Sequence, residues 1–518
     1  MTGFVDVLLR TLILAAQALA VGGVVWALWV LRPPLDRADA LRRAWTLIAA
    51  GAGVLGSAQT LSVLIQLSAL AADGGWRLSD VLVTLYVRAS AGRVAAAIVL
   101  IAAALALRRR PSAGARLTAI AAAAALVLLA PWTSHAAARV TGRAPLLALD
   151  AVHQVAAWVW VGGLAHLVAV AARPGPAGWP TALLQRISAL ALVSVGVLVT
   201  AGAGLSLAYV EGIPALLGTA YGVMVLTKVV LLGVLLLLGA FNFLTVRRLG
   251  RTGGVSPLRL RRFVEVELGL GLTVLGAAAS LTSLPPAVDV VADRATFAEV
   301  GTRFVPRWPS FSSPALSELP IDDRNAPRTD ADRAWSEYNH HWSGLFVLAM
   351  GVLALLHHTG HARWARHWPL IFLGLAVFLF LRSDPGSWPL GPVGFWQSML
   401  FPEVLQHRFF ILIVVAFAIF EWMVRTARLA RPACALVFPL LCAVGGGLLL
   451  THSHASLNLK SEFLIEVTHA PLGILGIAVG WGRWLELRLA PEEGSLPGRV
   501  WAAALVGVGL LLVFYRES

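Results

Sequence analysis

Histidine residues lie at both ends of one apolar segment, residues 335–361. Its histidines are His340, His341, His357, His358 and His361. As a single helix rising about 1.5 Å per residue, the segment separates its two histidine groups by roughly 25 Å. That distance is close to the hydrocarbon thickness of a bilayer, about 30 Å. The segment is therefore predicted to place imidazole ligands at both mouths of one membrane span.

Other apolar segments begin or end with the same kinds of side chain. Glutamates three or four residues before a histidine share its helix face, and such pairs recur in helical bundles that bind metals. Imidazole suits copper, zinc, iron and nickel, and carboxylate either binds the metal or orients the ring. The alternative is a set of separate histidines tolerated at a membrane interface. We expect a metal site on this predicted outer face, formed by His340, His341, His407, His452, His454, His469, Glu337, Glu403 and Glu466.

A smaller group of ligands is expected at the opposite end of the same segment. His357 and His361 are one helical turn apart, which places two imidazoles on one helix face, and His358 is adjacent. A solvated loop rich in Arg and His is the alternative. Met350 lies midway along the span, where its thioether suits Cu(I), although a single methionine there more often contributes only packing.

Composition places the chain among membrane proteins. It is 58% hydrophobic and 13% charged, with a mean hydropathy of +0.78. The net charge of +14 does not indicate a nucleic-acid partner, because the arginines fall in short clusters between apolar runs and act as topology signals. The only cysteines, Cys434 and Cys442, lie in one apolar run, so no disulfide framework is expected.

The spacing of apolar runs predicts an all-α polytopic bundle of about fourteen transmembrane helices. The predicted spans are 4–31, 42–72, 80–107, 116–132, 146–171, 182–208, 220–246, 263–284, 339–358, 368–382, 408–427, 433–451, 463–488 and 499–515. Basic clusters follow the first, third, seventh, ninth, eleventh and thirteenth spans, which are all alternate loops, and this predicts a cytoplasmic location for those loops and an external location for both termini. We expect an eight-span module (1–284), a proline-rich external connector (285–336) and a six-span, histidine-rich module (337–518).

The first module contains few ionisable residues at membrane depth, and such residues usually line a path or pair with one another. His153 follows Asp150 by three residues, so the carboxylate is expected to hydrogen-bond the ring. Lys228 and Glu267 are the other candidates for a pathway. His166 has no acidic neighbour on its helix, and we expect a packed, satisfied histidine there.

A series of motifs between residues 150 and 287 resembles the copper resistance D (CopD) family. The series is His and Trp before Gly-Gly, a Tyr-Gly opening to a span with one Lys, an Asn at its far end, and a Glu-containing span ending in Pro-Pro. The histidine-rich second module is similar to the long members of that family. The resemblance implies a bacterial inner-membrane protein that moves copper, often beside a small periplasmic copper-binding partner. Its matching polar positions are His153, Lys228 and Glu267.

These observations together favour a copper transporter and not an enzyme. Copper, as Cu(I) or Cu(II), would be captured outside and passed inward by ligand exchange between weak sites. No P-loop or phosphorylated-aspartate motif is present that would supply energy from ATP. Two alternatives stay open: a haem-binding membrane oxidoreductase with axial histidine pairs, and a copper sensor or assembly factor that binds the ion without moving it.

Overall fold

The structure, a computed structural model, describes residues 2–33, 35, 38–72, 78–171, 180–252, 257–319, 329–451 and 459–517. Helices are the regular elements throughout these ranges. Fourteen of them are long and apolar enough to cross a membrane, which confirms the predicted all-α, multi-pass architecture. Helices suit this composition because a backbone within lipid must satisfy its hydrogen bonds internally. Contacts divide the chain into two units, residues 1–294 with 451–457, and residues 295–450 with 458–518.

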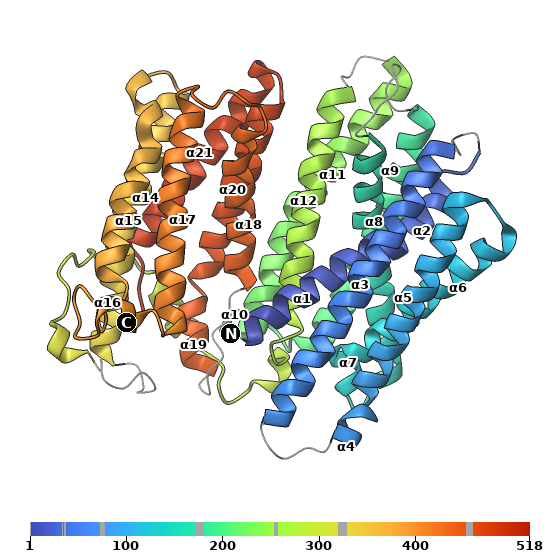
Figure 1. The fold of residues 1–518 in the computed structure, drawn as a ribbon, viewed down its shortest axis with the longest axis horizontal. Coiled ribbons are helices and arrows are strands. Elements are labelled where there is room, and N and C mark those ends of the chain that lie inside the picture. The colour runs from blue at the N-terminus through green and yellow to red at the C-terminus, as the bar shows by residue number, and fades with distance from the viewer. Residues whose placement is uncertain are drawn as a thin grey trace. The chain divides into compact units, whose positions relative to one another are not determined.

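Unit 1 is organised around its first span, Val5–Val30, which is largely buried. This span is α1 (Thr2–Gln17) followed by the π-helical η1 (Ala18–Gly22), α2 (Gly23–Val25) and the π-helical η2 (Trp26–Val30). The other elements of the unit are α3 (Ala38–Ala72), α4 (Leu78–Leu82), α5 (Leu85–Arg109), α6 (Ala113–Leu129), η3 (Ala130–Thr133), α7 (His135–Ala138), α8 (Arg143–Ala171), α9 (Thr181–Tyr209), α10 (Ile213–Gly218), α11 (Ala220–Thr252), α12 (Pro257–Leu281) and η4 (Ala287–Asp289). The first span packs against α3, α8 and α12 (Figure 1).

Unit 2 is built around α14 and the last span. Its elements are α13 (Phe297–Phe304), η5 (Leu316–Glu318), α14 (Asp330–His358), η6 (Arg363–Leu370), α15 (Ile371–Arg382), α16 (Phe395–Ser398), α17 (Pro402–Arg425), η7 (Cys434–Leu436), α18 (Val437–Thr451), α19 (Leu459–Glu466), α20 (His469–Arg488) and α21 (Pro491–Val513). Helix α21 packs against both α14 and α20 (Figure 1).

Two local features of unit 2 position its histidines. Helix α14 begins nine residues before the predicted span, because Thr329 and Asp332 form a capping box that satisfies its first backbone N–H groups. The predicted span 463–488 is interrupted between α19 and α20. Pro471 lies in the first turn of α20, where its missing N–H is tolerated, and the break makes His469 the first residue of that helix.

Candidate metal-binding site

His340 on α14 and His469 on α20 are held in the same way. The Nδ1 atom of His340 lies 2.8 Å from the carbonyl oxygen of Ser336, and Nδ1 of His469 lies 3.0 Å from that of Ile465. Because a carbonyl oxygen only accepts, each Nδ1 carries the proton and donates it one helical turn back. The lone pair of each ring is therefore on Nε2, and a histidine held this way is in the tautomer that binds metals.

The two rings lie close to each other and to Tyr515. The ring centroids of His340 and His469 are 6.2 Å apart and the planes are inclined by 78°. The Tyr515 ring stacks on His340 at 3.8 Å and meets His469 edge-on at 5.7 Å. An ion held at about 2 Å by one nitrogen of each ring would separate the centroids by on the order of 6 Å. The observed spacing is compatible with two imidazoles binding one ion.

Glu517, which the sequence motifs did not single out, is the buried carboxylate beside these rings. It is 4% exposed, and its Oε1 atom accepts hydrogen bonds from the hydroxyls of Ser336 (2.6 Å) and Tyr515 (2.9 Å). Its backbone N–H donates to Oε1 of Glu337 at 2.8 Å. Tyr515 and Glu517 are about 175 residues from His340 along the chain, so no helical spacing connects them to the histidine motif.

His341, a predicted ligand, joins two backbone segments. The ring is 4% exposed, and Nδ1 and Nε2 each lie 2.9 Å from a carbonyl oxygen, those of Ser310 and Tyr515 respectively. Both nitrogens are thus engaged by the backbone. In this arrangement His341 fixes the segment that carries Tyr515 over the His340 ring.

The remaining outer residues do not complete a larger group within the described part of the chain. The Nδ1 atom of His407 lies 2.8 Å from a carboxylate oxygen of Asp384, on the loop after α15, while Glu403 is exposed. Glu466 is half-buried at the end of α19. His452 and His454 lie outside the described residues. Among the residues that are described, no three His, Cys, Asp or Glu side chains are grouped to hold one metal ion.

The predicted pairing of His357 with His361 on one helix is wrong. Helix α14 ends at His358, and Gly360 adopts a left-handed conformation (φ +78°) that turns the chain away. His361 consequently lies beyond the helix as an exposed ring whose Nδ1 is 2.9 Å from the Thr359 hydroxyl. Spacing of four residues gives a shared face only while the helix continues.

His358 belongs to a polar network that connects three helices. Its Nδ1 lies 2.9 Å from Oε1 of Glu486 on α20, and its Nε2 lies 3.3 Å from the carbonyl of Ser495 on α21. The other oxygen of Glu486 accepts hydrogen bonds from Arg483 (2.6 Å) and from the indole of Trp501. Both nitrogens of His358 are thus engaged, and the ring joins α14 to its two neighbours.

Met350 lies in the apolar core of unit 2. It is fully buried, and the same cluster contains Trp368, Val479 and Trp501. Its thioether therefore packs in the structure, as the sequence favoured for a lone methionine.

In unit 1, Glu267 is a satisfied buried carboxylate. It is 4% exposed and accepts hydrogen bonds from the indole of Trp160 (3.1 Å) and the amide of Asn242 (2.7 Å). The donors come from α8 and α11, so the carboxylate on α12 joins three helices. Within a bilayer such a bond network replaces the hydration that the carboxylate loses.

The expected bond between Asp150 and His153 is absent from the described structure. Asp150 accepts hydrogen bonds from Ser134 (2.6 Å) and Gln154 (2.9 Å). The His153 ring turns to α9, where its Nδ1 lies 3.1 Å from the carbonyl of Leu198 and Gly202 leaves room for it. The half-buried Lys228 on α11 lies close enough to Asp150 for their charges to interact.

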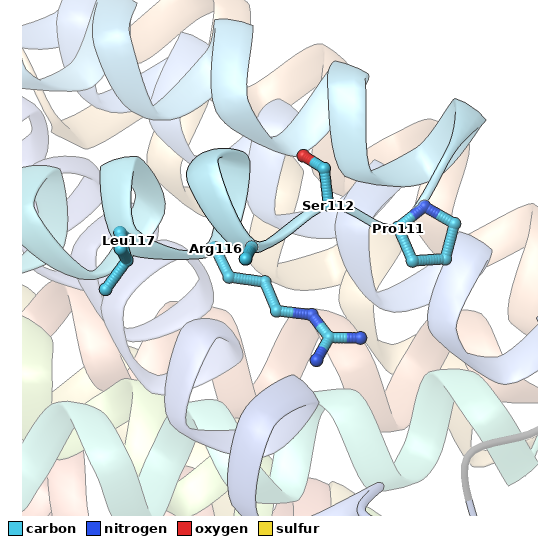
Figure 2. Close-up of a pocket in the computed structure, with 5 residues that line it drawn as sticks. Pro111, Ser112, Arg116 and Leu117 are labelled. Atoms are coloured by element: carbon cyan, nitrogen blue, oxygen red, sulfur yellow. The ribbon is translucent and has the colours of Figure 1, made fainter.

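A surface pocket lies at the turn between α5 and α6. Pro111, Ser112, Arg116 and Leu117 line it (Figure 2). All of its lining residues come from one short stretch, and it contains none of the predicted site residues. The pocket therefore plays no part in the candidate metal site.

Comparison with known proteins finds a family match over one region of the chain. The family model described as "Copper resistance protein D" (CopD) matches residues 181–281, the stretch from the start of α9 to the end of α12. The chain is also similar to "Copper transport protein CutJ" of Bacillus subtilis (strain 168), with 34% identity over 165 residues. That alignment covers 31% of this chain and 29% of CutJ, so it spans less than a third of the curated relative. No solved structure matches the chain.

The family match includes three of the polar residues described above. Lys228, Asn242 and Glu267 lie within it, whereas His153 and all of unit 2 lie outside it. The family model thus confirms the resemblance found in the sequence motifs over residues 181–281 of this multi-pass membrane protein.

Proposed function

We propose that this protein moves copper ions across a bacterial cell membrane and that His340 and His469 capture the ion. The family assignment and the name of the Bacillus relative support copper as the substrate. The observation that carries the proposal is the pairing of two rings from α14 and α20 at 6.2 Å, each with its Nδ1 bound to a backbone carbonyl.

Two neutral imidazoles are suitable for a transported ion. The Nδ1–H bonds fix the ring orientation and increase the basicity of Nε2, so the ion binds well enough to load. Two nitrogen ligands bind less tightly than the four ligands of a structural metal site, so the ion can leave again. The stacked ring of Tyr515 limits the positions that His340 can adopt.

The proposal includes the side of the membrane on which copper is captured and the direction in which it moves. The basic loops predict that both termini are external, which places the His340 and His469 pair at the outer mouth of its spans. We propose inward transport from that side. His357, half-buried in the last turn of α14, is the described histidine best placed to receive the ion at the opposite end. The small periplasmic partner implied by the resemblance stays a prediction.

Copper accumulation in cells tests the proposal. The variant His340→Ala/His469→Ala, expressed at the wild-type level in a copper-sensitive host, should abolish most of the additional cellular copper that the wild-type protein provides. The matched control is His367→Gln, since Nδ1 of this ring accepts a hydrogen bond from the Trp422 indole and lies outside the proposed path. Accumulation equal to wild type in the double variant would contradict the proposal.

An absorption spectrum of the purified protein separates copper transport from the haem alternative. A haem bound between two imidazoles gives a Soret band, whereas bound Cu(I) gives none. We expect no Soret band. A stoichiometric Soret band lost in the double variant would favour the oxidoreductase instead.

A further inference from the structure

Three polar side chains buried in unit 1 carry atoms that have no hydrogen-bond partner among the described residues. Gln17, Trp26 and His166 are each 0% exposed. Neither atom of the Gln17 amide, nor Nε1 of Trp26, nor Nδ1 of His166 has a partner among the described residues. A buried polar group without a partner costs free energy, and native structures contain few of them. The first span contributes two of these groups and α8 contributes the third.

The lone pair of His166 is on the atom that has no partner. Its Nε2 lies 3.0 Å from the carbonyl oxygen of Leu19, so Nε2 carries the proton and donates it. Nδ1 is then the unprotonated nitrogen. The Trp26 ring lies beside the imidazole, with centroids 6.2 Å apart and planes inclined by 25°. The sequence predicted a packed, satisfied histidine here, whereas only Nε2 of the two ring nitrogens has a partner among the described residues.

The backbone of the first span is shaped to admit this ring. Both η1 and η2 are π-helical turns, which are rare and often lie at functional sites. A Cβ atom on Gly23 would lie 2.4 Å from Nε2 of His166, so only glycine leaves room for the imidazole. Nearby, Gly22 and Gly162 bring the two backbones into contact, since a Cβ on Gly162 would lie 2.0 Å from the carbonyl oxygen of Ala18.

The surroundings of His166 select the kind of ligand. Within the described residues, the ring of His166 contacts the Leu19 carbonyl and the Trp26 indole, and neither group carries a charge. Without a carboxylate, the site cannot balance the charge of a divalent cation. Imidazole nitrogen and the face of an indole ring both suit a soft cation of single charge.

We propose that His166, with its Nδ1 lone pair beside the Trp26 ring, is a transfer site for Cu(I) inside unit 1. The inference rests on the proposed function in that copper is the transported ion. It adds that unit 1 has a binding step of its own, in the first span and α8, outside both the residues matched by the family model and the histidines of unit 2.

Titration of the purified full-length protein with Cu(I), under reducing conditions and against a competing chelator, tests this site. His166→Phe keeps a ring of similar size without either nitrogen and should lose one equivalent of bound Cu(I). His340→Ala/His469→Ala should retain that equivalent. Full stoichiometry in His166→Phe would overturn the inference. If His340→Ala/His469→Ala binds as much Cu(I) as wild type while His166→Phe still loses one equivalent, the result would contradict the proposed function and not this inference.

A second variant keeps the test valid if His166→Phe does not fold. His166→Gln retains an N–H donor for the Leu19 carbonyl but replaces the imidazole lone pair with an amide oxygen, a poorer ligand for Cu(I). A well-folded His166→Gln protein should bind this equivalent at least tenfold more weakly than wild type. Unchanged affinity would show that the ring only packs.

Discussion

The ring of Tyr515 stacks on the ring of His340, with centroids 3.8 Å apart and planes inclined by 21°. Tyr515 lies two residues beyond Val513, where α21 ends, and His340 lies ten residues after Asp330, where α14 begins. The contact is reinforced by the Tyr515 hydroxyl, which donates to Glu517, and by the Tyr515 carbonyl, which contacts His341. The orientation of a proposed metal ligand therefore depends on a segment remote from it in sequence.

Replacing Tyr515 should weaken copper capture without abolishing transport. Tyr515→Leu removes the stacked ring and allows His340 additional rotamers, so we expect the copper concentration for half-maximal uptake to rise about tenfold. Tyr515→Phe keeps the ring and loses only the hydrogen bond from its hydroxyl to Glu517. Its copper concentration for half-maximal uptake should therefore rise less. Initial uptake rates at several copper concentrations measure both variants. Equal values for Tyr515→Leu and wild type would show that stacking does not position His340.

His341→Ala should destabilise unit 2. The substitution removes the ring that lies 2.9 Å from the carbonyl oxygens of Ser310 and of the buried Tyr515, and a buried carbonyl left unsatisfied costs about 1–3 kcal/mol. Thermal unfolding of the detergent-purified protein measures the loss. The exposed ring of His361 provides a matched histidine, and His361→Ala should unfold at the wild-type temperature. A copper-binding defect in His341→Ala without a loss of stability would instead identify His341 as a ligand.

Gly162→Ala should disrupt the packing of α8 on the first span. The added methyl group would lie 2.0 Å from a backbone oxygen, which cannot move as a flexible side chain can. Overpacking typically costs about 1–3 kcal/mol, and a backbone clash belongs at the upper end of that range. Gly53→Ala on α3 is the control, because nothing lies within 4 Å of its added Cβ. Comparable folded yields for the two variants would contradict the close approach.

The ion pair between Glu299 and Lys460 predicts that the stability of unit 2 depends on pH. The Lys460 ammonium, 2.7 Å away, and the hydrogen bonds from Thr296 lower the pKa of Glu299 from its ordinary 4.5 to about 2. Because the folded pKa lies below the unfolded one, the pair stabilises the fold above about pH 4.5, and this contribution is lost as the pH falls toward 2. Both side chains are partly exposed to solvent, so the effect should be small.

Thermal unfolding of wild type and Glu299→Gln between pH 2 and 6 checks this dependence. The difference between the two proteins should be present at pH 6 and vanish near pH 2. A difference that stays constant over this range would show that Glu299 does not titrate as a paired group.

Hydropathy was sufficient to predict the fold class but not the local helix geometry. Runs of apolar residues identify membrane spans because a helix that crosses lipid must be apolar over its length. Fourteen spans and an all-α bundle therefore followed from the hydropathy pattern alone. The π-helical turns of the first span and the break before His469 depend on packing and on Pro471. These features leave the mean hydropathy of a span unchanged. The predicted limits of the two modules and the connector stay predictions.

The candidate site was predictable only in part for a related reason. Helical spacing connects neighbours in sequence, and the predicted list included both His340 and His469. Helical spacing predicted that Glu403 pairs with His407, whereas the carboxylate in contact with His407 is that of Asp384, on a loop 23 residues earlier. It also paired His357 with His361 across a helix end that Gly360 determines. The orphaned nitrogen of His166 has no sequence signal at all, because it results from the carbonyl of Leu19 on another helix.

Copper flux into proteoliposomes tests the central claim most directly, since it requires only the purified protein, lipid and the ion. The account predicts that wild-type protein and His367→Gln transport copper at similar rates, and that His340→Ala/His469→Ala, reconstituted in equal amount, loses at least nine-tenths of that flux. Flux in the double variant equal to wild type would contradict copper capture by the two histidines. Binding without any flux in the wild-type protein would contradict transport itself.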